Sequence, residues 1–282
     1  MHAIEIRHLS KSYKDFTLED VSLTLPQGCI MGLIGENGAG KSTVIKLILN
    51  MIEKDEGTIS LFGKDHQDSI HLAKEEIGVV LDEVGLPGCL TPVQIGKVMR
   101  HVFQHWDDAE YTGYLTTFDL PRHQKFKEFS RGMKMKLEIA IALSHHPKLL
   151  ILDEATSGLD PVIRDEILDI FNEFTRDETH SILISSHIVS DLEKICDYIA
   201  FLHQGKLLLC AEKDMLKAEY CLIHCSAAQL AEIPSDAIQG VKKNIYGAEA
   251  IVRRDQVPAD MEIHPIDIEQ LFIFMAKETD IS

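Results

Sequence analysis

Hydrophobic and polar positions follow two different periods along the first part of the chain. Residues 2–9 and 17–25 alternate apolar and polar side chains, as strands with one buried face do. Residues 29–34 form a short, continuously apolar strand that enters a glycine-rich loop, and a helical pattern then runs over 41–51. A strand, a glycine loop and a helix in this order are the opening of a parallel α/β unit.

The alternation of strands and helices continues to about residue 210. Strands are expected at 57–62 and 77–81, and the interval 91–144 is helical in pattern. The fully apolar run 149–152 is typical of a strand at the centre of a parallel sheet. Further helices are expected at 161–176 and 188–195, and further strands at 181–186, 197–203 and 206–210.

The pattern weakens after about residue 219. Three strand-like pieces and one apolar helix are expected there, at 220–225, 240–246, 248–253 and 268–276. We therefore expect an α/β domain over 1–218, with a helical subdomain at about 91–146, and a small C-terminal α+β accessory domain over 219–282.

The composition is that of a globular protein with an acidic balance. The chain has 282 residues, of which 45% are hydrophobic and 26% charged, and this length suggests about two domains. Its 28 basic residues against 45 acidic ones give a formal net charge of −17. Such a chain is a poor candidate for charge-driven binding to nucleic acid or anionic lipid. Backbone N–H groups can still bind a phosphate locally.

The six cysteines are scattered and form no C-x-x-C pair. Cys221 and Cys225 have His224 between them but no second pair of ligands nearby, so reduced thiols are favoured over a metal site. The first residues lack the basic and apolar regions of a secretory signal, and no apolar run approaches the ~18 residues of a transmembrane helix. We therefore expect a cytoplasmic protein, with any membrane role supplied by a partner.

The loop between the strand at 29–34 and the helix at 41–51 fits the phosphate-loop pattern G-x-x-x-x-G-K-[ST]. The matching residues are Gly35, Glu36, Asn37, Gly38, Ala39, Gly40, Lys41 and Ser42, followed by Thr43. Glycines allow the backbone N–H groups to close around a phosphate, and the helix N-terminus adds a favourable dipole. Lys41 reaches the β- and γ-phosphate oxygens, and the Ser42 hydroxyl binds Mg²⁺. A chance glycine-rich turn is the alternative, and the flanking strand and helix argue against it.

Two acidic residues follow the apolar strand at 149–152. Asp153 is expected at the carboxyl end of this strand, beside the phosphate loop, where it can hold Mg²⁺ through water. Glu154 is placed to orient or deprotonate an attacking water. A strand end followed by a solvated acidic turn is the alternative. The presence of a phosphate loop 112 residues before Asp153, counted from Lys41, favours the catalytic interpretation.

Over about residues 2–215 the chain resembles the nucleotide-binding subunits of ABC transporters. The segment FSRGM at 129–133 is similar to a variant of the family's LSGGQ signature, and SGLD at 157–160 resembles the loop after the catalytic Glu. His187 resembles the family's switch histidine, and Tyr13 resembles the aromatic residue that stacks on adenine. These motifs occur in the family's order, which makes the resemblance specific.

The resemblance implies a P-loop NTPase fold of the ABC type and roles for several residues. Ser130 and Gly132 would face the γ-phosphate of an ATP bound by a second subunit, Asp160 would lie at that interface, and His187 would sense the γ-phosphate. Simpler explanations stay open: Ser130 as a helix cap, Asp160 as a turn residue before a proline, and Tyr13 as an exposed residue at a strand end.

Two departures from the family pattern stand out. The family has a Gln after the strand at 77–81, where this chain has Asp82; a carboxylate can bind Mg²⁺, but it lacks the amide expected to couple to the membrane partner. The signature carries Arg131 and Met133 where Gly and Gln are usual. Such substituted signatures, and the C-terminal extension, resemble the bacterial exporter branch.

The leading hypothesis is an ATP-hydrolysing motor subunit of an ABC exporter that uses Mg²⁺. Two copies, or one copy and a paralogue, would close over ATP, and a separate polytopic permease would dock on the surface around 82–106. The protein would then lie on the inner face of the cell membrane, with no nucleic-acid partner. The alternatives are an ABC-type ATPase that acts on ribosomes or chromosomes, and a catalytically silent regulatory subunit.

Overall fold

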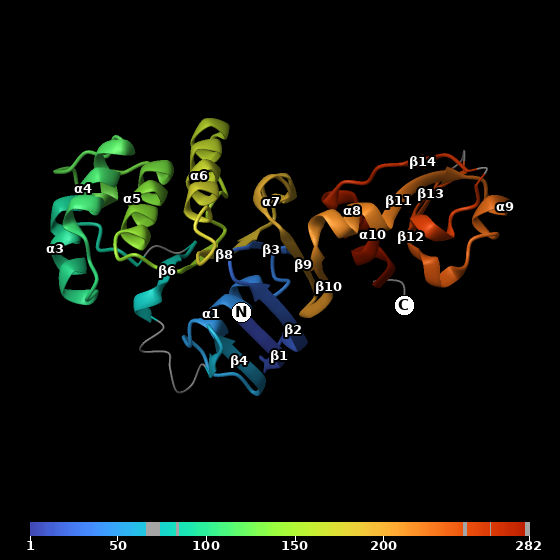
Figure 1. Ribbon diagram of the computed structural model, residues 1–282, viewed down its shortest axis with the longest axis horizontal. Helices are drawn as coiled ribbons and strands as arrows, with labels where there is room; N and C mark the ends of the chain where they lie inside the picture. The colour runs from blue at the N-terminus through green and yellow to red at the C-terminus, as the bar shows by residue number, and fades with distance from the viewer. Residues whose placement is uncertain (66–73, 83–84, 245–246, 260, 280–282) are drawn as a thin grey trace.

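The computed structural model describes residues 1–65, 74–82, 85–244, 247–259 and 261–279, which form two β-sheets with helices around them (Figure 1). The larger sheet has ten strands, which are β1 (His2–Ser12), β2 (Thr17–Pro26), β3 (Ile30–Ile34), β4 (Glu56–Leu61), β5 (Lys64–Asp65), β6 (Ile77–Val80), β7 (Leu149–Asp153), β8 (Ser181–Ser186), β9 (Tyr198–His203) and β10 (Lys206–Glu212). Their spatial order is β5-β4-β1-β2-β10-β9-β3-β8-β7-β6. All the strands expected before residue 210 are therefore present.

The strands β9, β3, β8, β7 and β6 run parallel to one another, and β10 pairs antiparallel with β9. Every residue of β3, β7 and β8 is buried, which is why β3 and β7 are apolar almost throughout and β8 has the continuous apolar run Ile182–Ile184 at its centre. The strands β1, β2, β4 and β5 pair antiparallel, and a single pairing of Lys206 with Glu19 joins them to the parallel part through β10. The carboxyl ends of β3, β7 and β8 thus meet at one edge of the sheet.

The helices are interrupted more often than their pattern suggested. They are α1 (Lys41–Ile48), α3 (Pro92–Val102), α4 (Asp108–Thr117), α5 (Arg131–Leu143), α6 (Pro161–Phe174), α7 (Val189–Ile195), α8 (Lys213–Glu219), α9 (Ala227–Leu230) and α10 (Ile268–Thr279), with short 3₁₀ turns at Lys74–Glu76, Phe126–Glu128, Ser235–Ala237 and Arg254–Gln256. The helical interval 91–144 contains three separate helices, α3, α4 and α5. Thr91 caps α3, and the carboxylate of Asp107 accepts hydrogen bonds from the first N–H groups of α4.

The C-terminal part forms a second sheet of four strands. These are β11 (Tyr220–Cys225), β12 (Ile238–Asn244), β13 (Gly247–Arg253) and β14 (Ile263–His264), in the order β12-β13-β11-β14. The apolar helix α10 packs against the first domain: the ring of Phe272 lies 5.3 Å from that of Phe201 in β9, and Leu271 is fully buried. The boundary predicted at 218/219 stays a prediction, although no strand of the second sheet begins before Tyr220. Within the described ranges, no helix is long and apolar enough to cross a bilayer.

Candidate active site

The phosphate-loop segment joins β3 to α1 and takes a conformation that only glycine adopts easily. Gly38 and Gly40 have φ angles of +85° and +109°. A Cβ atom on Gly35 would lie 2.4 Å from the carbonyl oxygen of Leu202 in the neighbouring strand β9. The glycines of the pattern are therefore required by backbone geometry and close approach.

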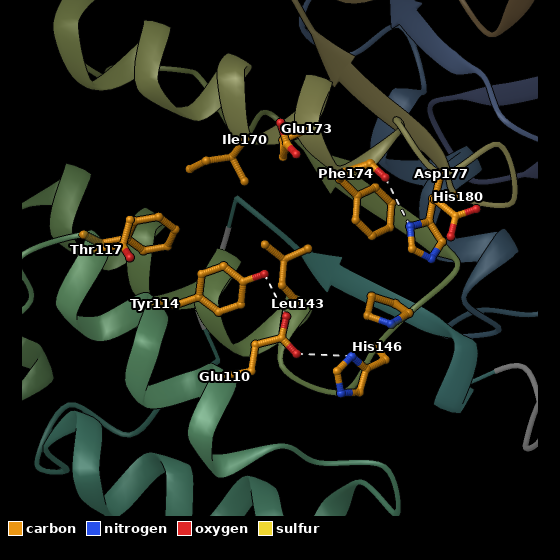
Figure 2. Close-up of a pocket in the computed structure, with 12 residues that line it drawn as sticks. Glu110, Tyr114, Thr117, Leu143, His146, Ile170, Glu173, Phe174, Asp177 and His180 are labelled. Carbon is orange, nitrogen blue, oxygen red and sulfur yellow. Dashed lines mark hydrogen bonds and ion pairs between the residues drawn. The ribbon is translucent and has the colours of Figure 1, made fainter.

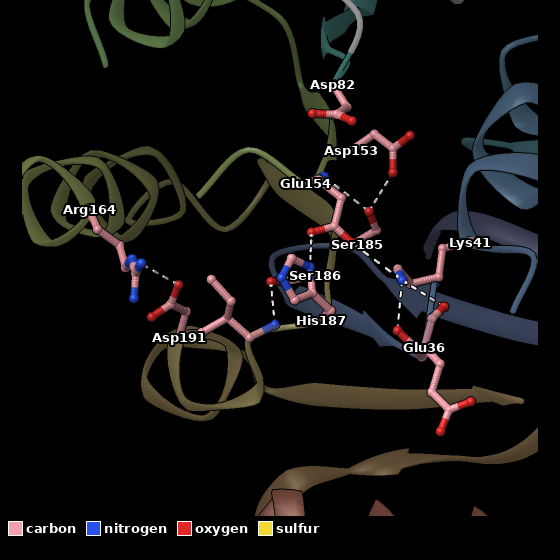
Figure 3. A network of polar contacts seen from close by, with 12 residues as sticks. Glu36, Lys41, Asp82, Asp153, Glu154, Arg164, Ser185, Ser186, His187 and Asp191 are labelled. Atoms are coloured by element: carbon pink, nitrogen blue, oxygen red, sulfur yellow. Dashed lines mark hydrogen bonds and ion pairs between the residues drawn. The ribbon is translucent and has the colours of Figure 1, made fainter. Parts of the chain in front are cut away.

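Lys41 is buried at the N-terminus of α1, and its ammonium group turns back over the loop (Figure 3). Its Nζ donates to the carbonyl oxygens of Gly35, at 2.6 Å, and Glu36, at 3.2 Å. The same Nζ lies 3.3 Å from Oε1 of Glu154. A buried cation is thus held by acceptors that a phosphate oxygen could replace.

The two acidic residues predicted to be catalytic lie at the end of β7, and the adjacent strand β8 fixes them. Asp153 pairs in register with Ser185, whose Oγ donates to Oδ1 of Asp153 at 2.5 Å. The same hydroxyl accepts a hydrogen bond from the backbone N–H of Glu154 at 3.1 Å. Ser185 was not predicted from the sequence. Its signal is a polar residue directly after the apolar run Ile182–Ile184, level with the acids once β8 is placed beside β7.

Glu154 lies between two groups that can carry positive charge. Its φ angle is +53°, an uncommon value for a residue with a side chain. Its Oε2 lies 2.7 Å from Nδ1 of His187, and its Oε1 faces the Nζ of Lys41. The three residues predicted to be catalytic, Lys41, Glu154 and His187, are therefore brought together in one polar network (Figure 3).

The oxygen donors predicted for Mg²⁺ come from three segments. Asp153 ends β7, and Asp82 follows its parallel neighbour β6, in which Val80 is level with Leu152. Ser42 stands in the first turn of α1. Carboxylate and hydroxyl oxygens are the hard ligands that Mg²⁺ prefers, so the residues present fit this ion. Glu83, which follows Asp82, lies outside the described residues.

The signature residues make local contacts within the chain. Ser130 is the N-cap of α5 and accepts from the N–H of Met133 at 3.2 Å. Asp160 is the N-cap of α6 and accepts from the N–H groups of Val162 and Ile163. Ser130 and Asp160 therefore both cap helices, which is compatible with the simpler explanations given above for these two residues. Their contacts with a second subunit remain predictions.

The two departures from the family pattern contact each other. Nη2 of Arg131 lies 3.4 Å from Oδ1 of Asp82, and both side chains are about half exposed. The guanidinium also packs on Gly158, where a Cβ atom would lie 2.6 Å from Nη1. Gly132 faces Ile163 of α6. The signature, the segment after β6 and the loop after Glu154 are therefore joined through Arg131.

Tyr13, the predicted adenine-stacking residue, is 46% exposed at the end of β1. The ring centroid of Tyr13 lies 6.4 Å from the ring centroid of Phe16. The Nζ of Lys11 lies 5.9 Å from the ring centroid of Tyr13. Phe16 is closer to the phosphate loop, because a Cβ atom on Gly40 would lie 2.9 Å from its Cζ. Phe16, which was not predicted from the sequence, offers a second aromatic surface beside the loop.

A cavity of 390 Å³ lies between α4, α5 and the end of α6 (Figure 2), and none of the predicted site residues lines it. Its polar groups bind one another: Tyr114 donates to Glu110 at 3.0 Å, and Nδ1 of His146 lies 3.1 Å from the same carboxylate. Asp107 completes a cluster of possible metal ligands with Glu110 and His146, but its carboxylate already caps α4. This cavity therefore carries no site assignment.

The comparisons with known proteins agree with this geometry. Residues 18–157 match the family model described as ABC transporter. The bacitracin transport ATP-binding protein BcrA of Enterococcus faecalis is 33% identical over 210 residues, which are 73% of this chain and 68% of BcrA. The chain belongs to the ABC transporter family.

Two further comparisons extend this result to most of the ABC domain. The lantibiotic transport ATP-binding protein SrtF of Streptococcus pyogenes is 37% identical over 214 residues, which are 75% of this chain and 91% of SrtF. A solved structure of the ATP-binding subunit of an ABC transporter is 31% identical, has a TM-score of 0.69 and covers 76% of this chain and 92% of its own. The fold predicted from the motifs, a P-loop NTPase of the ABC type, is confirmed. The chain is an ATP-binding subunit of an ABC transporter.

Proposed function

We propose that this ABC subunit hydrolyses ATP and thereby drives export through a separate membrane permease. The observation that carries the proposal is the network at the end of β7, in which Glu154 lies between Lys41 and His187. A general base needs a fixed position near a water and near the charge that develops on the phosphate. In support of the proposal, the contacts with Lys41 and His187 hold the carboxylate of Glu154 in one position, beside the ammonium predicted to bind the phosphates.

Each residue of the network has a distinct part in the proposed reaction. Lys41 binds the β- and γ-phosphates of ATP and stabilises the charge that builds up on the γ-phosphate. Glu154 accepts a proton from the water that attacks this phosphate, and His187 keeps the carboxylate in position. Ser42, Asp153 and Asp82 would hold Mg²⁺, which supplies charge neutralisation on the phosphates when bound.

Further residues of the chain would bind the base and the second subunit. Tyr13 would stack on adenine, and the remaining loop residues, Glu36 to Gly40 and Thr43, would surround the phosphates. Ser130, Gly132 and Asp160 would complete the ATP site of a second copy or a paralogue. Ser130 and Asp160 are exposed at the N-termini of α5 and α6, where the positive end of the helix dipole favours a nearby anion.

The permease would dock on the surface around 82–106. On α3, Val98 and Val102 are 48% and 57% exposed, which is unusual for two apolar side chains one turn apart. This arrangement places the subunit on the inner face of the cell membrane. The relatives named for bacitracin and lantibiotic transport favour export of an antibiotic-like peptide, or a similar amphiphile, by the permease.

The test is to purify the tagged chain from detergent-solubilised source cells and to identify its partners by mass spectrometry. We expect a polytopic membrane protein in stoichiometric amount. Recovery with ribosomes or DNA, without a membrane protein, would contradict the transport function while leaving the ATPase chemistry in place. A net charge of −17 disfavours that result. A purified complex without ATP turnover would instead indicate a silent regulatory subunit.

A further inference from the structure

A groove of 350 Å³ opens between α3, α5 and the end of β6, on the surface proposed for the permease. Its walls are apolar apart from one side chain. They are formed by Val79, Leu81, Leu86, Met99, Val102, Phe103 and Ile141, and the exception is Glu138. Val102, one of these residues, is also exposed to solvent. The groove is therefore apolar, with a single carboxyl group in its wall.

Glu138 is an unusual residue for this position. It is 7% exposed, and its Oε1 is buried with no hydrogen-bond partner in the described part of the chain. Burial raises the pKa of this carboxyl to about 8, and the ammonium of Lys134, one turn earlier on α5, only partly opposes that rise. An unpaired buried carboxyl destabilises the folded chain.

Two other acids are buried in the described part of the chain, and each faces a partner. Asp153 accepts from Ser185 at 2.5 Å, and Oδ2 of Asp191 makes no hydrogen bond but lies 3.6 Å from the guanidinium of Arg164. Glu138 differs from both because its Oε1 has no hydrogen bond and no cation was found within ion-pair distance of it among the described residues. The neighbours of Glu138 along α5, Leu137 and Ile139, are apolar and buried in the core. An apolar residue at 138 would continue this pattern, so packing does not explain the carboxyl. Positions that break local rules in this way are expected at functional sites.

We propose that Glu138 binds an arginine or lysine side chain carried by an apolar helix of the permease that lies in this groove. The inference rests on the proposed function, because it names the chemistry of that partner. A long basic side chain can lay its aliphatic stem along the apolar walls and place its charged end on the carboxyl. The single acid then selects partner helices with a matching charge and rejects those with an acid.

The first test compares Glu138→Gln and Glu138→Met with the wild-type chain, using the permease that the wild-type purification identifies. We expect both variants to bind the purified permease at least ten-fold more weakly, because neither can become a carboxylate beside the basic side chain. We also expect Glu138→Met to raise the Tm of the isolated subunit, since it removes an unpaired buried carboxyl. Glu232→Met, at an exposed site in the C-terminal part, is the matched control and should leave both quantities unchanged.

A structural role for Glu138 would give a different pattern. Glu138→Met would then lower the Tm and weaken binding together, or both variants would bind the permease as the wild type does. Either result would overturn the inference and leave the proposed function standing. If the wild-type chain captures no permease at all, the proposed function itself is contradicted, so the two failures are distinguishable.

The second test identifies what lies in the groove. A photo-crosslinking amino acid placed at Val102 should attach to one segment of the permease, and that segment should carry an arginine or lysine among apolar residues. Replacing this basic residue by alanine should weaken binding to wild type but change binding to Glu138→Gln little, as expected for a directly coupled pair. Attachment to a second copy of the chain, or to a segment without a basic residue, would overturn the inference.

Discussion

The nucleotide-binding edge of the sheet and the groove beside α3 both bury ionisable side chains, but these side chains have different partners in the two places. At the edge, the ammonium of Lys41 is held by two carbonyl groups and Glu154, and Asp153 accepts from Ser185. In the groove, the Oε1 of Glu138 has no partner within the described residues. One site is internally satisfied, and the other is completed only by an additional molecule.

This difference follows from what each site has to bind. ATP is a small anion that meets a preorganised loop, so the protein can hold its own groups in place with internal hydrogen bonds until phosphate oxygens replace them. A partner helix brings its own charge into an apolar groove, so the carboxyl that receives this charge has to be left unpaired in the free subunit. The same chain therefore accepts a local loss of stability at one site and avoids it at the other.

Among substitutions at the nucleotide-binding edge, Lys41→Ala is expected to have the largest effect. Loss of the buried ammonium should weaken ATP binding by about 100-fold, because charge-assisted contacts to the phosphates disappear. Isothermal titration with ATP measures this directly. Lys46→Ala, at an exposed position of the same helix α1, is the control and should bind ATP normally. Equal affinities for the two variants would show that Lys41 does not contact the phosphates.

A smaller effect is expected from Ser185→Ala. The change removes the donor to Asp153 and the acceptor for the Glu154 N–H, so it should slow ATP turnover by about ten-fold and lower the Tm by several degrees. Ser186→Ala, which removes only the acceptor for the N–H of Ile188, should change turnover little. Identical behaviour of the two serine variants would mean that Ser185 does not position the acids.

The burial of Glu138 in the groove can be tested by measuring the free energy of unfolding as a function of pH. Between the ordinary Glu value of 4.5 and the raised pKa of about 8, the folded chain binds one proton more at Glu138 than the unfolded chain. The contribution of this group to stability is thus full below pH 4.5 and is lost as the pH rises towards 8, by about 1 kcal/mol per pH unit. Urea unfolding of Glu138→Gln at several pH values should lack this slope. Parallel curves for variant and wild type would show that Glu138 titrates normally.

The smallest effect concerns the Arg131–Asp82 pair. Both side chains are about half exposed, so a double-mutant cycle with Arg131→Gly and Asp82→Gln should give a coupling of less than about 1 kcal/mol in folding stability. The same cycle measured on ATP turnover tests whether the two departures compensate for each other. We expect the double variant to turn over ATP faster than either single one, and additive losses would contradict this.

The parallel strands and the phosphate loop could be predicted from the sequence because their signals are local. Continuous apolar runs mark β3, β7 and β8, and spacing alone identifies the loop from Gly35 to Ser42. The breaks between α3, α4 and α5 were not predicted, since they depend on caps such as Asp107 whose role becomes clear only once the helices pack.

Ser185, Phe16 and Glu138 could not be found from spacing in the sequence. Ser185 matters because β8 lies beside β7, a long-range pairing, and Phe16 matters because β2 brings it over Gly40. Glu138 looks like an ordinary helical residue in the sequence, and only its burial without a partner distinguishes it. Each of these roles comes from tertiary contact between distant segments.

The most direct test of the central claim is steady-state phosphate release from ATP by the purified chain and by Glu154→Gln, in the presence of Mg²⁺. We expect saturable release by the wild type and release at least 100-fold slower by the variant, with ATP binding retained, because only the proton acceptor is lost. Equal rates for the two proteins, or no release by the wild type in complex with its permease, would contradict the proposed role of Glu154.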